Sequence, residues 1–144
     1  MPILNYTTKI DQHKTVGEIQ GILARAGATA VTVDYDTSRY PVAVSFSVDI
    51  NGRLVPFRLP TNRNGVLVAM KQDDDIPSRF KAEEQARRVA WRIVKDWVEA
   101  QMAFIESNQA TLAQLFLPHV VRGDGRTFYE EIESSYLMLG DGGG

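Results

Sequence analysis

An Asn51-Gly52 pair separates two alternating apolar runs, and it constrains the fold more than any other feature of the sequence. Asn-Gly suits the two positive-φ positions of a two-residue type I′ turn. With this turn, residues 42–59 form one antiparallel hairpin in which apolar side chains face each other across one side. The predicted pairs on that side are Val48 with Val55, Phe46 with Phe57, and Val44 with Leu59. The sequence therefore predicts the register of the hairpin, and it places Ser45 and Arg58 on the opposite, polar face.

The segment before the hairpin predicts two strands and one helix. Residues 2–10 alternate weakly and contain β-formers, so we expect an N-terminal strand there. Thr15 and Glu18 form a capping-box pattern, which predicts a helix that begins at Thr15. A second strand is expected over 29–35, since apolar and polar residues alternate along it.

The segment after the hairpin is helical in pattern. We expect a short helix over 65–71, a long helix over 80–106, and a C-terminal helix opened by a second capping box at Thr127. Strands first and helices afterwards indicate a single α+β domain over residues 1–139. In that domain a small antiparallel sheet, made by the N-terminal strand and the hairpin, packs with the helices. Residues 140–144 are expected to form a flexible glycine-rich tail.

The composition excludes several classes of function. The chain has 144 residues, a net charge of −2 and no cysteine, so disulfides and thiolate metal sites are ruled out. A protein of this charge has no basic footprint for duplex DNA. No apolar run approaches a membrane span and the start of the chain has no signal-peptide pattern, so we expect a cytoplasmic protein.

No motif in the sequence carries catalytic chemistry. His13 and His119 lie far apart and have no metal-ligand spacing. The sequence contains neither the nucleophile-elbow motif nor the phosphate-binding-loop motif. The run Asp73-Asp74-Asp75 indicates a solvated loop. We therefore expect a non-enzymatic protein that uses no cofactor and no metal.

The long helix has two apolar rows, and two interpretations of them remain open. The first row is a heptad-like seam, and its members are Ala86, Ala90, Ile93, Trp97, Ala100 and Phe104. The second row consists of Trp91, Val94, Val98, Met102 and Ile105. In one interpretation this is a core helix between the sheet and the C-terminal helices. In the other, one row covers the sheet while the seam meets a symmetry mate, which predicts a homo-oligomer through residues 86–105.

Arginines near apolar or aromatic surface are the best candidates for binding an anionic ligand, because their planar fork suits phosphates. Arg58 is the first choice, since it has no acid on its own hairpin face except Asp49. Arg92, like Arg88, has acidic residues at helical pairing distance, which favours a structural role. The full candidate set for the ligand site is Arg58, Arg63, Arg87, Arg92, Ser45 and Tyr6.

Four segments resemble one group of short phage and prophage proteins, most of them described as hypothetical proteins. These segments are residues 2–10, 15–20, 57–60 and 85–101. The resemblance implies a phage setting, in which small non-catalytic oligomers act by occupying a host target. By this analogy we expect a counter-defence protein that sequesters a small nucleotide signal, of the cyclic oligonucleotide or cyclic ADP-ribose type, in the host cytoplasm. The alternatives are an accessory single-stranded nucleic-acid-binding protein of phage replication or recombination, and a direct inhibitor of a host defence enzyme.

Overall fold

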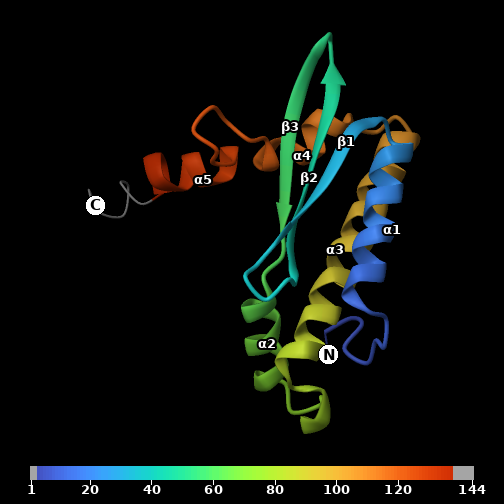
Figure 1. The fold of residues 1–144 in the computed structure, drawn as a ribbon, viewed down its shortest axis with the longest axis vertical. Coiled ribbons are helices and arrows are strands. Elements are labelled where there is room, and N and C mark those ends of the chain that lie inside the picture. Colours follow the sequence, from blue (N-terminus) through green and yellow to red (C-terminus); the bar gives the residue numbers. More distant parts are fainter. Residues whose placement is uncertain (1–2, 138–144) are drawn as a thin grey trace.

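The computed structural model of the chain describes residues 3–137, and its class is α+β (Figure 1). The expected tail over 140–144 and the last residues of the C-terminal helix lie outside these residues. The elements follow in the order α1 (Gln12–Arg25), β1 (Ala28–Tyr35), β2 (Pro41–Ile50), β3 (Arg53–Pro60), α2 (Arg63–Gln72), η1 (Ser78–Phe80), α3 (Glu83–Glu106), α4 (Leu112–Phe116), η2 (Leu117–His119), α5 (Phe128–Ile132) and the π-helical turn η3 (Glu133–Leu137).

The hairpin is confirmed in turn and in register. Asn51 and Gly52 have φ values of 53° and 85°, as a type I′ turn requires, and the Asp49 carboxylate accepts a hydrogen bond from the Gly52 N–H at 2.8 Å. The predicted partners face each other across β2 and β3, including Phe46 with Phe57 and Ser45 with Arg58. β1 pairs antiparallel with β2, so the sheet has the order β1-β2-β3.

The prediction of an N-terminal strand over residues 2–10 is wrong for residues 3–10, the part of that segment that the structure describes. Residues 4–7 form turns, and the segment packs against α3 through hydrogen bonds from the Gln85 side chain to the carbonyls of Tyr6 and Thr8, at 2.9 and 2.8 Å. The third strand of the sheet is instead β1. Because α3 satisfies these carbonyls, the segment needs no neighbouring strand.

The expected helix start at Thr15 is also wrong. α1 begins three residues earlier, at Gln12, because the Asp11 carboxylate accepts a hydrogen bond from the N–H of His13 and acts as the N-cap. Thr15 is buried inside the helix, and the Glu18 carboxylate is engaged by Arg92 of α3 at 2.8 Å. The second capping box is confirmed, with Thr127 capping α5.

The core has two parts, and α3 runs through both. Along its second half, α3 packs with α1 and the apolar sheet face, where Phe46, Phe57 and Phe116 form an aromatic cluster. Its first half packs with α2 around Met70 and Val89. Figure 1 shows α1 and α3 side by side, with α2 beside the first half of α3 and α5 standing apart. The long helix is therefore a central core helix, but it lies mainly between the sheet, α1 and α2.

The seam on α3 is buried along one half and open along the other. Ala86 and Ala90 are buried, whereas Trp97 is 36% exposed and Phe104 is 44% exposed. Ala100 lies between these two aromatic residues and is exposed as well. An oligomer through this helix stays a prediction, and the surface available for it is the segment 97–104.

Candidate functional site

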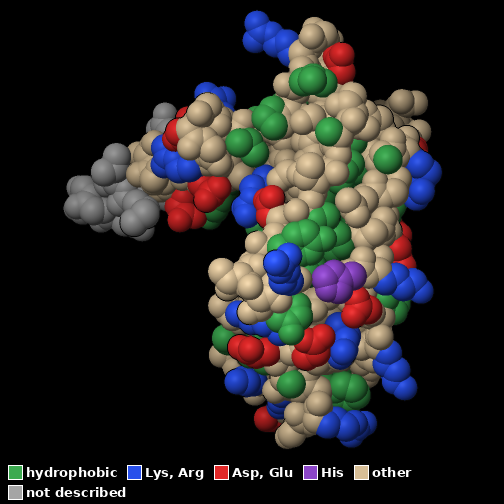
Figure 2. Space-filling model, viewed as in Figure 1, with side chains coloured by type: hydrophobic (Ala, Val, Ile, Leu, Met, Phe, Trp, Pro, Cys, Tyr) green, Lys and Arg blue, Asp and Glu red, His purple; other side chains and the backbone are tan. Residues whose placement is uncertain are grey.

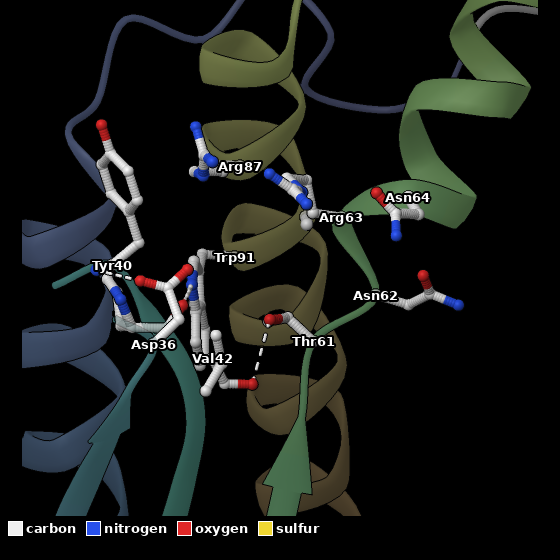
Figure 3. Close-up of a pocket in the computed structure, with 11 residues that line it drawn as sticks. Asp36, Tyr40, Val42, Thr61, Asn62, Arg63, Asn64, Arg87 and Trp91 are labelled. Atoms are coloured by element: carbon white, nitrogen blue, oxygen red, sulfur yellow. Dashed lines mark hydrogen bonds between the residues drawn. The ribbon is translucent and has the colours of Figure 1, made fainter. Parts of the chain in front are cut away.

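A hollow of about 180 Å³ lies where three segments meet, and we call it the arginine pocket. The segments are the loop between β1 and β2, the junction of β3 with α2, and the first half of α3 (Figure 3). Its lining consists of Asp36, Tyr40, Pro41, Val42, Thr61, Asn62, Arg63, Asn64, Arg87, Ala90 and Trp91. The pocket thus combines two guanidinium groups with amides, a hydroxyl, two aromatic rings and the Asp36 carboxylate, which accepts hydrogen bonds from its own loop.

Local hydrogen bonds fix two of the three segments, the β1–β2 loop and the junction of β3 with α2. The Asp36 carboxylate accepts hydrogen bonds from the N–H groups of Ser38 and Tyr40, at 2.9 and 3.0 Å, which closes the β1–β2 loop as an Asx turn. The Thr61 hydroxyl donates to the Val42 carbonyl at 3.2 Å and holds the end of β3 against β2. These turn residues place the Tyr40 ring and the start of α2 on opposite sides of α3 (Figure 3).

Trp91 joins the pocket to the core. Its side chain is 1% exposed, and its indole N–H donates to the carbonyl of Pro41 at 3.2 Å. This bond fixes the first residue of β2 to α3. The bottom of the pocket is therefore part of the packed interior and not of a mobile surface.

The two arginines reach the same opening from different helices. The Arg87 guanidinium lies over the Tyr40 ring at 3.9 Å from its centroid, and its side chain is only 14% exposed. Arg63 is the first residue of α2 and its side chain is 32% exposed. Glu83 lies near both, with distances of 3.6 Å to Arg63 and 4.0 Å to Arg87, and Glu84 lies 3.6 Å from Arg87. Pairs this long and exposed contribute little, typically about 0–1 kcal/mol each.

The start of α2 adds donors beside these arginines. Asn62 is the N-cap, and its side chain accepts a hydrogen bond from the Gly65 N–H at 2.8 Å. The N–H groups of Arg63 and Asn64 have no acceptor among the hydrogen bonds of residues 3–137. A helix start favours negative charge, so these two N–H groups and the two guanidinium groups together suit an anion.

Arg58 and Ser45 lie on the open sheet face, away from the arginine pocket. The expectation that Arg58 lacks an acid there is wrong, because Asp34 on β1 pairs with it at 3.3 Å. The sequence did not reveal this pair, since Asp34 joins that face only through the β1–β2 register. Ser45 faces Arg58 directly across the hairpin, as predicted.

A second hollow, of about 490 Å³, lies on the other side of Arg58 next to His119 and Glu130. Burial lowers the pKa of His119, and a hydrogen bond with the Arg58 backbone acts against this shift. Hydrogen bonds from the backbone and hydroxyl of Thr127 lower the pKa of Glu130, whose carboxylate caps α5. The charged groups in this hollow already have partners within the fold, so it is the weaker candidate for anion binding.

Arg92 and Tyr6 have packing roles. Arg92 joins α3 to α1 through Glu18 at 2.8 Å, and this partner replaces the helical neighbours expected from the spacing. The Tyr6 ring stands edge-on to Phe80 at 5.6 Å and belongs to the α2–α3 core. Of the six candidates, the structure brings Arg63 and Arg87 together at the arginine pocket and Ser45 and Arg58 together on the sheet face, whereas Arg92 and Tyr6 belong to neither site. Sequence reasoning considered Tyr40 only as a stacking platform for single strands, assigned Trp91 to a packed row and missed Thr61. The Asn62 N-cap signal next to Arg63 was the one local hint.

Charges on the surface around the arginine pocket are mixed. On the face in Figure 2, Lys and Arg side chains alternate with Asp and Glu over the region of α2 and the first half of α3. Within residues 3–137, no cluster of three or more His, Asp or Glu side chains could hold a metal ion, and no helix has the length and apolarity to cross a membrane. Affinity for an anion therefore has to come from local geometry.

Comparisons with known proteins do not add a family. No family model matches the chain, and no similar protein was found among curated proteins or solved structures.

Proposed function

We propose that the protein is a non-enzymatic binding protein for a small, phosphate-bearing nucleotide and that the arginine pocket holds the phosphate. The observation that carries this proposal is the convergence of Arg63 and Arg87 on one opening, next to two N–H groups at the start of α2. Most groups that line the pocket suit binding and orientation of an anion: guanidinium forks, amides, a hydroxyl and two aromatic rings. The Asp36 carboxylate is the exception, and the N–H groups of Ser38 and Tyr40 engage it.

The size of the pocket supports a particular mode of binding. At about 180 Å³ it is smaller than the roughly 300–1,000 Å³ typical of pockets that enclose a drug-sized ligand. It suits the phosphate end, while the base and sugar lie across the opening. Sequestration of a host immune signal in a homo-oligomer, as the phage resemblance implies, is the wider role that we propose, with a second copy covering the exposed part of the ligand.

Calorimetric titration of the purified protein tests the proposal. The probes are AMP, a cyclic dinucleotide and cyclic ADP-ribose. Arg87→Ala and Arg63→Ala should each weaken binding about ten- to a hundredfold, because a hydrogen bond to a charged group is worth roughly 1.5–3 kcal/mol. Arg87→Lys should recover part of the affinity, since an ammonium group lacks the planar fork.

Two control variants locate the site. Arg79 lies over the Phe80 ring at 4.7 Å, so Arg79→Ala removes the same charge and a similar ring contact outside the pocket. It should leave binding unchanged, and so should Arg58→Ala. No heat and no thermal shift with any probe would overturn the proposal. Loss of binding in Arg58→Ala, with Arg87→Ala unaffected, would move the site to the sheet face.

A further inference from the structure

We infer that Glu83, which lies beside the arginine pocket and outside its lining, is an internal counter-ion of Arg63 and Arg87, and that the ligand group which displaces it is a phosphate monoester. The inference rests on the proposed function, because it concerns the same pair of arginines. It goes further by naming an internal competitor and the chemical class of the group that replaces it. Cyclic oligonucleotides and cyclic ADP-ribose contain no phosphate monoester, so the inference favours a linear nucleotide with a terminal phosphate over the cyclic signals that the phage resemblance implies.

The contacts of Glu83 with the two arginines are long and weak. One carboxylate oxygen, Oε2, lies 3.6 Å from Nη1 of Arg63 and 4.0 Å from Nη2 of Arg87. Charge-assisted hydrogen bonds between nitrogen and oxygen are shorter, at about 2.7–2.9 Å. The Glu83 side chain is 61% exposed, so water can replace its contacts at little cost. A single oxygen is therefore shared between two forks and satisfies neither.

A phosphate monoester fits the same place better than a carboxylate does. It offers three terminal oxygens, enough to engage Arg63 and Arg87 separately and also to accept from the free N–H groups at the start of α2. At neutral pH it carries nearly two negative charges. A monoanionic diester that displaces Glu83 restores only the charge that was lost, whereas a monoester adds a second charge opposite the two guanidinium groups.

Glu84 provides a matched control for Glu83. Both residues lie in the first turn of α3, where a negative charge stabilises the helix to a similar extent. Glu84 contacts Arg87 and Arg88, at 3.6 and 3.5 Å, but it has no contact with Arg63. Among the acidic residues within 3–137, Glu83 alone pairs with both arginines of the pocket, at distances up to 4.0 Å.

The test compares Glu83→Gln and Glu84→Gln by calorimetric titration with AMP and cyclic AMP. These probes share base and sugar but differ as monoester and diester. Glu83→Gln should bind AMP about fivefold more tightly than the wild type, since a weak ion pair of about 1 kcal/mol no longer competes, and Glu84→Gln should stay within about twofold. The wild type should bind AMP at least about tenfold more tightly than cyclic AMP.

The outcomes separate this inference from the proposed function. If Glu83→Gln and Glu84→Gln bind AMP with equal affinity, and binding still depends on Arg87, the role of Glu83 is wrong while the proposed function stands. Cyclic AMP binding as tightly as AMP would overturn the monoester assignment. If neither the wild type nor Glu83→Gln binds AMP at millimolar concentration, but the wild type binds the cyclic dinucleotide or cyclic ADP-ribose, the inference is wrong and the proposed function stands. If none of these probes binds, both are wrong.

Discussion

Replacing Trp91 with phenylalanine should destabilise the protein far more than the same change at Trp97. Trp91 is 1% exposed and its indole N–H donates to the carbonyl of Pro41, itself a buried residue. Phenylalanine removes this donor to a buried carbonyl, and the loss of a buried hydrogen bond costs about 1–3 kcal/mol. The smaller ring also leaves a cavity beside the β2 strand, so the total loss should be about 2–4 kcal/mol.

Trp97 is the natural control within the same helix. It is 36% exposed, and its indole N–H has no acceptor among the hydrogen bonds of residues 3–137. Its ring stands edge-on to Phe116 at 5.1 Å, a contact that phenylalanine partly preserves. Trp97→Phe should therefore cost less than about 1 kcal/mol.

Urea unfolding followed by circular dichroism at 222 nm measures both variants without relying on tryptophan fluorescence. With a typical slope near 2 kcal/mol per molar urea, the midpoint of Trp91→Phe should fall by roughly 1–2 M. That of Trp97→Phe should fall by less than about 0.5 M. Equal midpoints for the two variants would refute the argument that the Trp91 bond fixes β2 to α3.

Two further predictions concern α3. Ala90 is 4% exposed, so Ala90→Glu buries a charge and should unfold the protein in a melting experiment. Ala100 is exposed, so Ala100→Glu should keep the fold. In light scattering, Ala100→Glu should convert the predicted oligomer into single chains of 16.1 kDa. A wild-type protein that is already monomeric at tens of micromolar would contradict the oligomer. Burial acts to raise the pKa of Glu18, but the hydrogen bond and charge of Arg92 outweigh burial and lower that pKa below 4.5. The Glu18–Arg92 pair therefore stabilises the fold fully above pH 4.5, and this stabilisation is lost as the pH falls below that value. Glu18→Gln should reduce this acid-dependent loss of stability in urea titrations at pH 3–7, and an unchanged pH profile would argue against the pair.

Local rules predicted the hairpin because each of them determines the same register. The Asn51-Gly52 turn and the apolar pairing on either side of it agree, so no tertiary information was needed. The capping box at Thr127 succeeded for the same reason, since donor and acceptor lie three residues apart.

The N-terminal segment was mispredicted because its partners lie far along the chain. The side chain of Gln85 binds two carbonyls of this segment, and Arg92 engages Glu18, which the pattern had assigned to a cap. These contacts span more than seventy residues. β-propensity describes local preference, and the tertiary contacts of Gln85 overrode it here. The helix start was wrong for a local reason, because Asp11 caps the helix before Thr15 is reached.

The candidate site was also hard to predict because its residues have partners on other elements. Arg58 ranked first because its missing acid could be judged only from its own hairpin, whereas its partner Asp34 comes from the neighbouring strand. Arg63 and Arg87 are brought together by the packing of α2 on α3, which no spacing rule predicts. Because Glu83 contacts both arginines, the packing of α2 on α3 that forms the pocket also places a weakly held carboxylate beside them. A carboxylate held this loosely between two guanidinium groups offsets part of their mutual repulsion, and in our proposal a more highly charged phosphate takes its place.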